Sequence, residues 1–472
     1  MATGAIYIQV PPNERKLLMV PAIFAEQALL PTGWARNVAI DLAPDGSIAG
    51  VRAGASPEGL QRANGPVIPG MINLHSHAFQ RAMAGLAEVA LNPDDSFWSW
   101  RELMYRLVGR LEPDQVGAIA AYLYIDMLKG GYTSVAEFHY LHHDTDGKPY
   151  SDPAEMSRCL LTAAEATGIR MTLLPVMYAQ GGFGGKPPSA AQRRFTHDPE
   201  AYLALLERLE PACNGRLALG ASFHSLRAVT PDEITAVLQG MKPGLPIHIH
   251  IAEQQKEVDD CQAWSGRRPI ELLYDRWNVD ERWCLIHATH ADGGEIERMA
   301  KSGAVVGICP TTEANLGDGI FPAVAYTDAG GRFGIGSDSH VSVTVFEELR
   351  WLEYGQRLKH ERRNRLHGGG QNNIGGYLYG AALAGGTQAL GQRVGRIEAG
   401  CRADLVVLDG RHPLLANIKA DDILSRWIFA GAIRMVRDVM VAGDWVIQDS
   451  RHPDEIEAGR AFAASVRILL ED

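Results

Sequence analysis

Eight short apolar segments, separated by longer amphipathic stretches, run through residues 66–390. The segments are Val67–His75, Thr133–Tyr140, Arg170–Tyr178, Arg216–His224, Pro246–Ala252, Trp283–His287, Ala304–Cys309 and Arg332–Ser337. Helix-start signals lie between them, because Asp152, Asp198 and Thr230 each precede a proline. Eightfold alternation of strand and helix predicts an α/β fold of the (β/α)₈ barrel type. No Gly-x-Gly-x-x-Gly follows the first segment, which disfavours a dinucleotide-binding sheet.

Both ends of the chain have a different pattern of apolar and turn residues. Residues 1–65 contain short strand-like runs, starting at Lys16–Val20, with an Asp45-Gly46 turn typical of a β-hairpin. Residues 391–472 return to this pattern in 395–409, 436–441 and 444–448 and then finish with a helix candidate at Pro453–Leu470. We therefore expect residues 1–65 and 391–472 to form one small β-sandwich, with the barrel of residues 66–390 inserted between its halves.

Composition excludes several classes of protein. The 45 Lys and Arg against 56 Asp and Glu give a net charge of −11, which argues against a nucleic-acid partner bound on a broad basic face. No segment is apolar for long enough to cross a membrane. The six cysteines form no Cys-x-x-Cys pair, which predicts reduced thiols and a cytoplasmic location.

Histidines mark the ends of two predicted strands. His75 and His77 are two residues apart, so both rings face the same side of the first strand. His248 and His250 repeat this spacing on the fifth strand, and Asp338 follows the eighth. Three imidazoles and one carboxylate leave a coordination position for water, which is typical of a catalytic zinc site, although iron(II) or manganese would fit the same donors.

Two further residues can move protons next to such a site. Glu253 lies three residues after His250, and His287 ends the sixth strand. Hydrolysis by a metal-activated water needs a proton acceptor and then a donor to the leaving nitrogen, and a carboxyl and an imidazole can supply both.

The order His75-x-His77, His250-x-x-Glu253, His287 and Asp338 resembles that of the amidohydrolase superfamily, in particular its mononuclear deaminases. Binuclear members carry a carboxylated lysine on the fourth strand, and Leu217–His224 contains no lysine. The resemblance implies one divalent metal per chain, most simply Zn²⁺, held by His75, His77, His250 and Asp338. It also implies catalytic roles for Glu253, His287 and Asp338, and it favours His250 over His248 and His287 over His290.

Four loop segments resemble the formimidoylglutamate deiminase family more closely: 75–85, 97–105, 222–229 and 309–319. The resemblance implies hydrolysis of N-formimino-L-glutamate to N-formyl-L-glutamate and ammonia in histidine degradation, by attack of a metal-bound hydroxide on the formimino carbon. It further implies a homodimer. The substrate contacts that it implies are Gln80, Arg101, Tyr140, His224 and Arg227.

The charges agree with this substrate, since a net acidic protein must supply local cations to bind a dicarboxylate. Arg101 and Arg227 follow the first and fourth strands, and their planar guanidinium groups suit carboxylates. We interpret Phe97, Trp98 and Trp100 as packing that positions Arg101. Two alternatives remain: an aminohydrolase of a purine or another heterocycle, which would favour aromatic and amide contacts over two arginines, and an inactive binding protein on the same scaffold.

Overall fold

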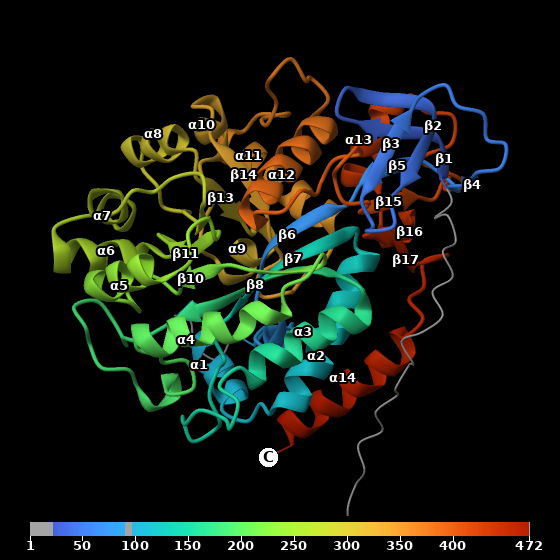
Figure 1. The fold of residues 1–472 in the computed structure, drawn as a ribbon. Helices are drawn as coiled ribbons and strands as arrows, with labels where there is room; N and C mark the ends of the chain where they lie inside the picture. Colours follow the sequence, from blue (N-terminus) through green and yellow to red (C-terminus); the bar gives the residue numbers. More distant parts are fainter. Residues whose placement is uncertain (1–21, 90–96, 472) are drawn as a thin grey trace, which may run out of the picture.

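The computed structural model describes residues 22–89 and 97–471, and it confirms the predicted barrel (Figure 1). The parallel barrel strands are β6 (Met71–Ser76), β7 (Tyr132–His139), β8 (Arg170–Met177), β9 (Leu217–Leu219) with β10 (Ala221–Phe223), β11 (Ile247–Ile251), β12 (Trp283–His287), β13 (Val305–Ile308) and β14 (Arg332–Ile335). Pairing of β10 with β8 and of β14 with β6 closes the ring. The carboxyl ends of all these strands therefore meet at one mouth.

Helices surround the barrel (Figure 1). They are α1 (Phe97–Val108), α2 (Pro113–Lys129), α3 (Glu155–Thr167), α4 (Pro199–Leu209), α5 (Pro231–Gly240), α6 (Gln255–Ser265), α7 (Pro269–Arg276), α8 (Gly293–Ser302), α9 (Pro310–Leu316), α10 (Ala323–Asp328), α11 (Val345–His360), α12 (Ile374–Leu390), α13 (Ile423–Ala430) and α14 (Glu455–Leu470). Asp198 and Thr230 cap α4 and α5 as expected. Asp152 instead accepts a bond from the Ala154 backbone, and α3 begins two residues later than the proline signal suggests.

Two predicted barrel strands are each divided by a glycine. The first breaks at Gly70 into β5 (Val67–Pro69), which belongs to the small sheet, and β6 of the barrel. A side chain at Gly70 would lie 2.2 Å from the Thr133 side chain. The fourth breaks at Gly220, where an added Cβ would lie 2.5 Å from Leu174. Both breaks follow from close packing that only glycine permits.

The small domain combines both ends of the chain, as predicted. Its strands are β1 (Ile23–Leu30), β2 (Gly33–Leu42), β3 (Ile48–Arg52), β4 (Gln61–Arg62), β5, β15 (Leu405–Leu408), β16 (Val436–Val441) and β17 (Asp444–Ile447). They form one hydrogen-bonded sheet in the order β17-β16-β15-β5-β1-β2-β3, with β4 beside β1. The predicted strand at Lys16–Val20 lies outside the described residues. The division of the chain at residues 65/66 and 390/391 remains our proposal.

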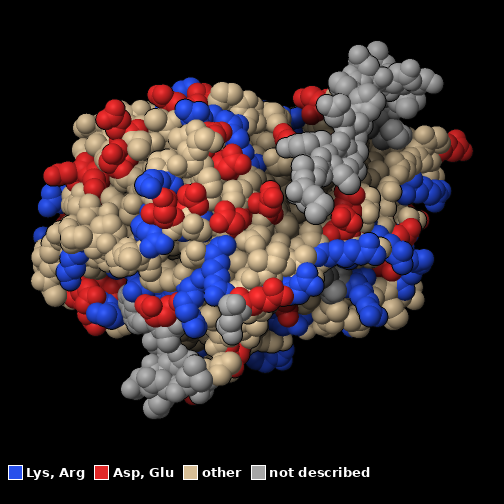
Figure 2. All heavy atoms as spheres, turned by 90° about the horizontal axis from the view of Figure 1, so that it is seen from below, with Lys and Arg blue, Asp and Glu red and all other residues tan. Residues whose placement is uncertain are grey.

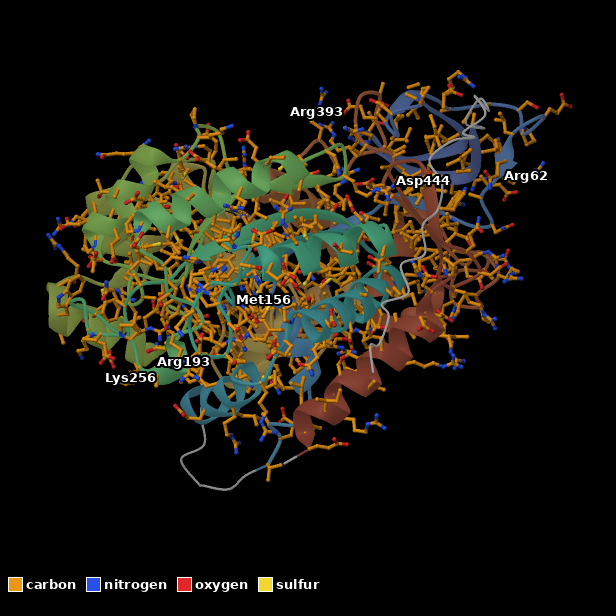
Figure 3. The ribbon with its side chains drawn as sticks, turned by 60° about the horizontal axis from the view of Figure 1, so that its bottom comes forward. Arg62, Met156, Arg193, Lys256, Arg393 and Asp444 are labelled. Atoms are coloured by element: carbon orange, nitrogen blue, oxygen red, sulfur yellow. The ribbon has the colours of Figure 1, made fainter. Side chains whose placement is uncertain are left out.

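A buried ion pair joins the two domains. Arg170 on β8 and Asp404, next to β15, are both fully buried and form two hydrogen bonds of 2.7 and 3.1 Å. Figure 3 shows the small domain, with Arg62 and Asp444, at the opposite end of the molecule from Arg193 and Lys256. The small sheet is thus fixed to the barrel at the end of the molecule away from Arg193 and Lys256.

The surface charges, the hydropathy of the helices and the cysteines can be compared with the sequence. On the face shown in Figure 2, Lys and Arg are interspersed with Asp and Glu over the part that the structure describes. None of the helices in the described ranges combines the length and apolar character needed to cross a lipid bilayer. All six cysteines lie in these ranges, and each is unpaired.

Candidate metal centre and active site

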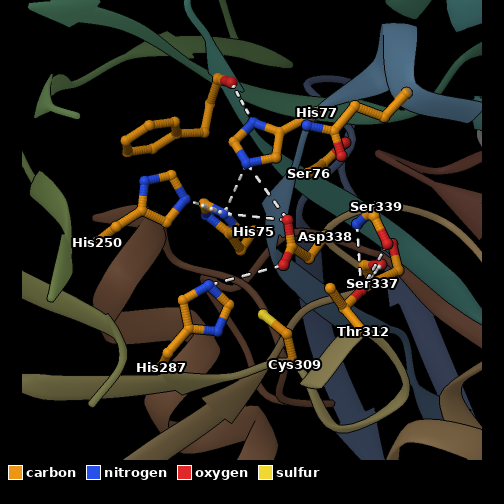
Figure 4. A network of polar contacts seen from close by, with 12 residues as sticks. His75, Ser76, His77, His250, His287, Cys309, Thr312, Ser337, Asp338 and Ser339 are labelled. Atoms are coloured by element: carbon orange, nitrogen blue, oxygen red, sulfur yellow. Dashed lines mark hydrogen bonds and ion pairs between the residues drawn. The ribbon is translucent and has the colours of Figure 1, made fainter. Parts of the chain in front are cut away.

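Four of the predicted ligands meet at the mouth of the barrel (Figure 4). The Nε2 atom of His75 lies 3.1 Å from Nε2 of His77 and 2.9 Å from Nε2 of His250. The Oδ1 atom of Asp338 lies 3.3 Å from Nε2 of His77. Their side chains come from β6 and the residue after it, from β11 and from the loop after β14. The parallel register thus brings together residues that are up to 263 positions apart in sequence.

The second ring nitrogen of two ligands is fixed by the backbone. His77 Nδ1 donates to the Phe138 carbonyl at 2.8 Å, and His250 Nδ1 donates to the His224 carbonyl at 2.9 Å. A proton on Nδ1 leaves the Nε2 lone pair facing the cluster. Burial lowers the pKa of His77 to about 3 and holds the pKa of His75 and His250 well below the ordinary value. Neutral imidazoles with inward lone pairs are the form that binds a divalent metal.

Asp338 completes the donor set. Its backbone has a φ of 48°, and its amide donates to the His75 carbonyl at 3.0 Å, so a strained turn directs the carboxylate to the cluster. Burial raises the pKa of Asp338 to about 7. Three neutral imidazole nitrogens and one buried carboxylate are a donor set that fits a borderline divalent cation such as zinc.

The two predicted proton-transfer residues face the same cluster. His287 Nε2 lies 3.6 Å from Asp338 Oδ2 and 3.8 Å from Glu253 Oε1. Burial acts to lower the pKa of His287, but the carboxylates of Glu253, Glu313 and Asp338 outweigh it and raise the pKa to about 10. Burial also raises the pKa of Glu253. The pair can therefore hold and exchange a proton beside the cluster.

A cavity opens above these residues. It is lined by all five predicted substrate contacts, Gln80, Arg101, Tyr140, His224 and Arg227, together with His77, His250, Glu253, His287 and Asp338. Arg101 comes from α1, whereas Arg227 follows β10. Gln80 donates to the Tyr140 hydroxyl at 2.9 Å, which fixes both polar side chains on the wall. The cavity thus combines two cationic side chains with the predicted ligand cluster.

The aromatic wall differs from the sequence interpretation. Phe97 and Trp100 line the cavity themselves and do not only pack behind Arg101, whereas the Trp98 side chain lies outside the described part of the chain. The reason is that the first turn of α1, which carries both residues, borders the cavity.

Three aromatic residues were missed by the sequence reasoning: Tyr105, Tyr178 and Phe195. Tyr105 lies one helical turn after Arg101, whose guanidinium carbon is 5.4 Å from its ring, and Tyr178 directly follows β8. Helical spacing and strand-end position could have identified these two. Phe195 lies in an irregular loop, where no periodic signal exists.

Comparison with known proteins decides the family. The profile of the "Amidohydrolase family" matches residues 67–446, and that of the "Formimidoylglutamate deiminase HutF, N-terminal domain" matches residues 20–64. The formimidoylglutamate deiminase of Pseudomonas aeruginosa is 62% identical over 95% of this chain and 100% of its own length. This chain belongs to the formimidoylglutamate deiminase family of amidohydrolases.

Other similar proteins are an amidohydrolase and two deaminases of nucleoside-type compounds. An amidohydrolase structure from Brucella melitensis is 48% identical to this formimidoylglutamate deiminase family member, with a TM-score of 0.91 over 96% of this chain and 100% of that chain. A 5-methylthioadenosine/S-adenosylhomocysteine deaminase from Natronomonas pharaonis is 30% identical over 86% of each chain. An adenosine deaminase structure from Xanthomonas campestris, 21% identical with a TM-score of 0.77 over 95% of this chain and 98% of that chain, shows the fold alone.

The structure also separates the close histidine pairs of this deiminase-family chain. His248 Nε2 donates to the Ala389 carbonyl at 2.9 Å, whereas His250 joins the cluster. His287 faces Asp338, and His290 does not line the cavity. The use of His250 over His248 and of His287 over His290 stays a prediction.

Proposed function

We propose that this protein hydrolyses N-formimino-L-glutamate to N-formyl-L-glutamate and ammonia, as a step of histidine degradation. The observation that carries the proposal is one cavity lined by Arg101, Arg227 and the histidine–aspartate cluster. A substrate that carries two carboxylates and an amidine carbon matches that arrangement. The identity of 62% to the Pseudomonas aeruginosa formimidoylglutamate deiminase supports the same reaction.

We propose that His75, His77, His250 and Asp338 hold one divalent metal, preferably zinc. The fourth strand, β9 and β10, carries no lysine that could bridge a second ion. When bound, the metal would act as a Lewis acid and lower the pKa of water to supply the nucleophile. Elemental analysis of protein purified without added metal should find close to one equivalent per chain, whereas two equivalents retained after dialysis would contradict a mononuclear site.

The residues around the cluster have distinct proposed roles in proton transfer. Asp338 accepts the proton of the attacking water, since its Oδ2 faces the cavity side of the cluster near His287. His287 orients the nucleophile and stabilises the negative charge that develops on it. Glu253, whose pKa is raised by burial, delivers a proton to the leaving nitrogen, which departs as ammonia.

Substrate selection is assigned to the opposite wall. Arg101 and Arg227 bind the two carboxylates by charge-assisted hydrogen bonds, and Gln80, Tyr140 and His224 orient the chain between them and the cluster. Two fixed carboxylate anchors hold the formimino carbon at one position relative to the cluster. The aspartate homologue, one methylene shorter, should therefore react poorly because its reacting carbon is misplaced.

One side-by-side assay tests the proposed substrate. Ammonia release is measured with formiminoglutamate, formiminoaspartate, guanine, cytosine and S-adenosylhomocysteine. We expect formiminoglutamate to give the highest kcat/KM. A higher value for any of the heterocycles would favour the alternative function, an aminohydrolase of a purine or a related ring, and no release from any compound would favour a binding protein.

We also propose that the protein is a cytoplasmic homodimer. Six unpaired cysteines support a reducing compartment. Light scattering on the purified protein should give twice the chain mass of 51.4 kDa, and a monomer mass at micromolar concentration would contradict the dimer.

A further inference from the structure

A buried glutamate that the proposed reaction does not use contacts the far side of His287. Glu313 lies in α9, and its Oε1 atom accepts a hydrogen bond from His287 Nδ1 at 3.2 Å. The same oxygen accepts the backbone N–H of Cys309 at 2.9 Å. Glu313 is 5% exposed, and it is absent from the lining of the catalytic cavity. It therefore contacts the imidazole from outside the space where substrate would bind.

The carboxylate is held in place from two directions. Glu313 lies four residues after Cys309, so its side chain folds back onto the N–H of the residue that precedes its own helix. The helix itself is fixed by Glu348 on α11, which accepts bonds from the Thr311 amide at 3.0 Å and the Thr311 hydroxyl at 2.5 Å. Because α9 is anchored in this way, Glu313 provides a rigid acceptor for His287.

The backbone of His287 makes such an acceptor necessary. His287 and Ala288 have φ values of 69° and 48°, so β12 ends in a strained turn that does not by itself fix the ring. An imidazole can rotate about its bond to Cβ and exchange the positions of its polar and apolar edges. The bond from Nδ1 to Glu313 selects one orientation of the ring, with Nε2 directed at Asp338 and Glu253.

We infer that Glu313 is a positioning residue for the reaction, which fixes the Nδ1–H edge of His287 and thereby aims Nε2 at the reacting atoms. This inference rests on the proposed catalytic role of His287. Cys309 Sγ lies in the same group, but burial raises the pKa of this thiol well above its ordinary value, so the neutral thiol does not compete with the carboxylate for His287.

A double-mutant cycle tests the inference with four proteins: the native enzyme, Glu313→Leu, His287→Ala and the double variant. Glu313→Leu should lower kcat by about 10- to 100-fold, the usual effect of losing an outer partner of an active-site imidazole, while KM and metal content stay unchanged. In the His287→Ala background, Glu313→Leu should lower kcat no further, because the residue acts only through that ring.

Glu313→Gln keeps the shape of the site. Both bonds go to one oxygen, so an amide oxygen in that position preserves them, and this variant should retain more kcat than Glu313→Leu. In native protein the proton on His287 Nδ1 should give a downfield NMR resonance that is lost in His287→Ala and shifted in Glu313→Gln. This measurement remains decisive if Glu313→Leu fails to fold. A resonance that Glu313→Gln leaves unmoved would overturn the inference.

The outcomes separate the two claims. If His287→Ala is inactive while Glu313→Leu keeps native kcat, the positioning role is wrong and the proposed function stands. If His287→Ala keeps native kcat, the proposed role of His287 itself is wrong. Equal losses from Glu313→Leu in both backgrounds would also overturn the inference, since they would show a general structural role. Glu297→Leu, at a surface position on α8, serves as the matched control and should change nothing.

Discussion

Two buried clusters of ionisable side chains lie in this barrel, and they are built on opposite principles. At the domain junction, Arg170 bonds both oxygens of Asp404 and the Gly215 carbonyl, while the Ala442 amide donates to Asp404 at 2.7 Å. At the mouth, His75, His77, His250 and Asp338 bring lone pairs within 2.9–3.6 Å of one another.

The difference separates stability from function. Each partner in the junction complements the next, so the charges are compensated within the protein. The mouth cluster places like groups face to face, which is unfavourable unless a cation is bound between them. A metal-binding site is therefore visible as a concentration of acceptors that the protein alone does not satisfy.

Replacing Asp338 by Ala should abolish function at the mouth. It removes one proposed metal donor and the proposed proton acceptor. Lewis-acid catalysis lowers the activation free energy by about several kcal/mol, so kcat should fall by about 10³-fold or more. Elemental analysis should show reduced metal, while thermal unfolding stays close to that of the metal-free native protein. Native kcat in this variant would remove Asp338 from both roles.

Replacing Arg170 by Met should damage the junction instead. It leaves the Asp404 carboxylate buried without its partner, and breaking a buried pair costs about 3–5 kcal/mol of folding free energy. Denaturant unfolding measures the loss, and metal content should remain native. The double variant Arg170→Met/Asp404→Leu should recover part of the lost folding free energy. Lys301→Met removes one partner of an exposed pair with Glu297 and should have little effect on stability. Unchanged stability in Arg170→Met would refute the contrast.

Replacing Glu253 by Gln should separate proton transfer from metal binding. The amide keeps the size of the side chain but cannot deliver a proton, so kcat should fall by about 10²-fold. Metal content, measured on the same samples, should equal that of the native protein. Loss of the metal would instead identify Glu253 as a ligand.

Replacing Arg227 or Arg101 by Met should reduce specificity. A charged hydrogen bond contributes about 1.5–3 kcal/mol, so kcat/KM for formiminoglutamate should fall by at least about 10-fold in each variant. Formamidine, which has no carboxylate and cannot use either arginine, is the control substrate and should react equally with native and variant protein. Near-native kcat/KM for formiminoglutamate in both variants would show that the two arginines do not bind the carboxylates.

Much of the fold and the site was predictable because it depends on short-range spacing. Alternating apolar strands and capped helices predict a barrel, and two residues two positions apart on a strand must share a face. His75 and His77 therefore needed no structure to be paired. The breaks at Gly70 and Gly220 were not predictable, because each depends on a neighbour, Thr133 or Leu174, that lies far away in sequence.

The sequence by itself determined which residue types are available and on which strand ends they lie. Only the tertiary structure decided that His248 bonds the Ala389 carbonyl, that the Phe138 and His224 carbonyls fix the tautomers of two ligands, and that Glu313 contacts His287. The physical reason is that strand register and helix packing set distances between residues tens to hundreds of positions apart, and hydrogen bonds depend on those distances to within tenths of an ångström.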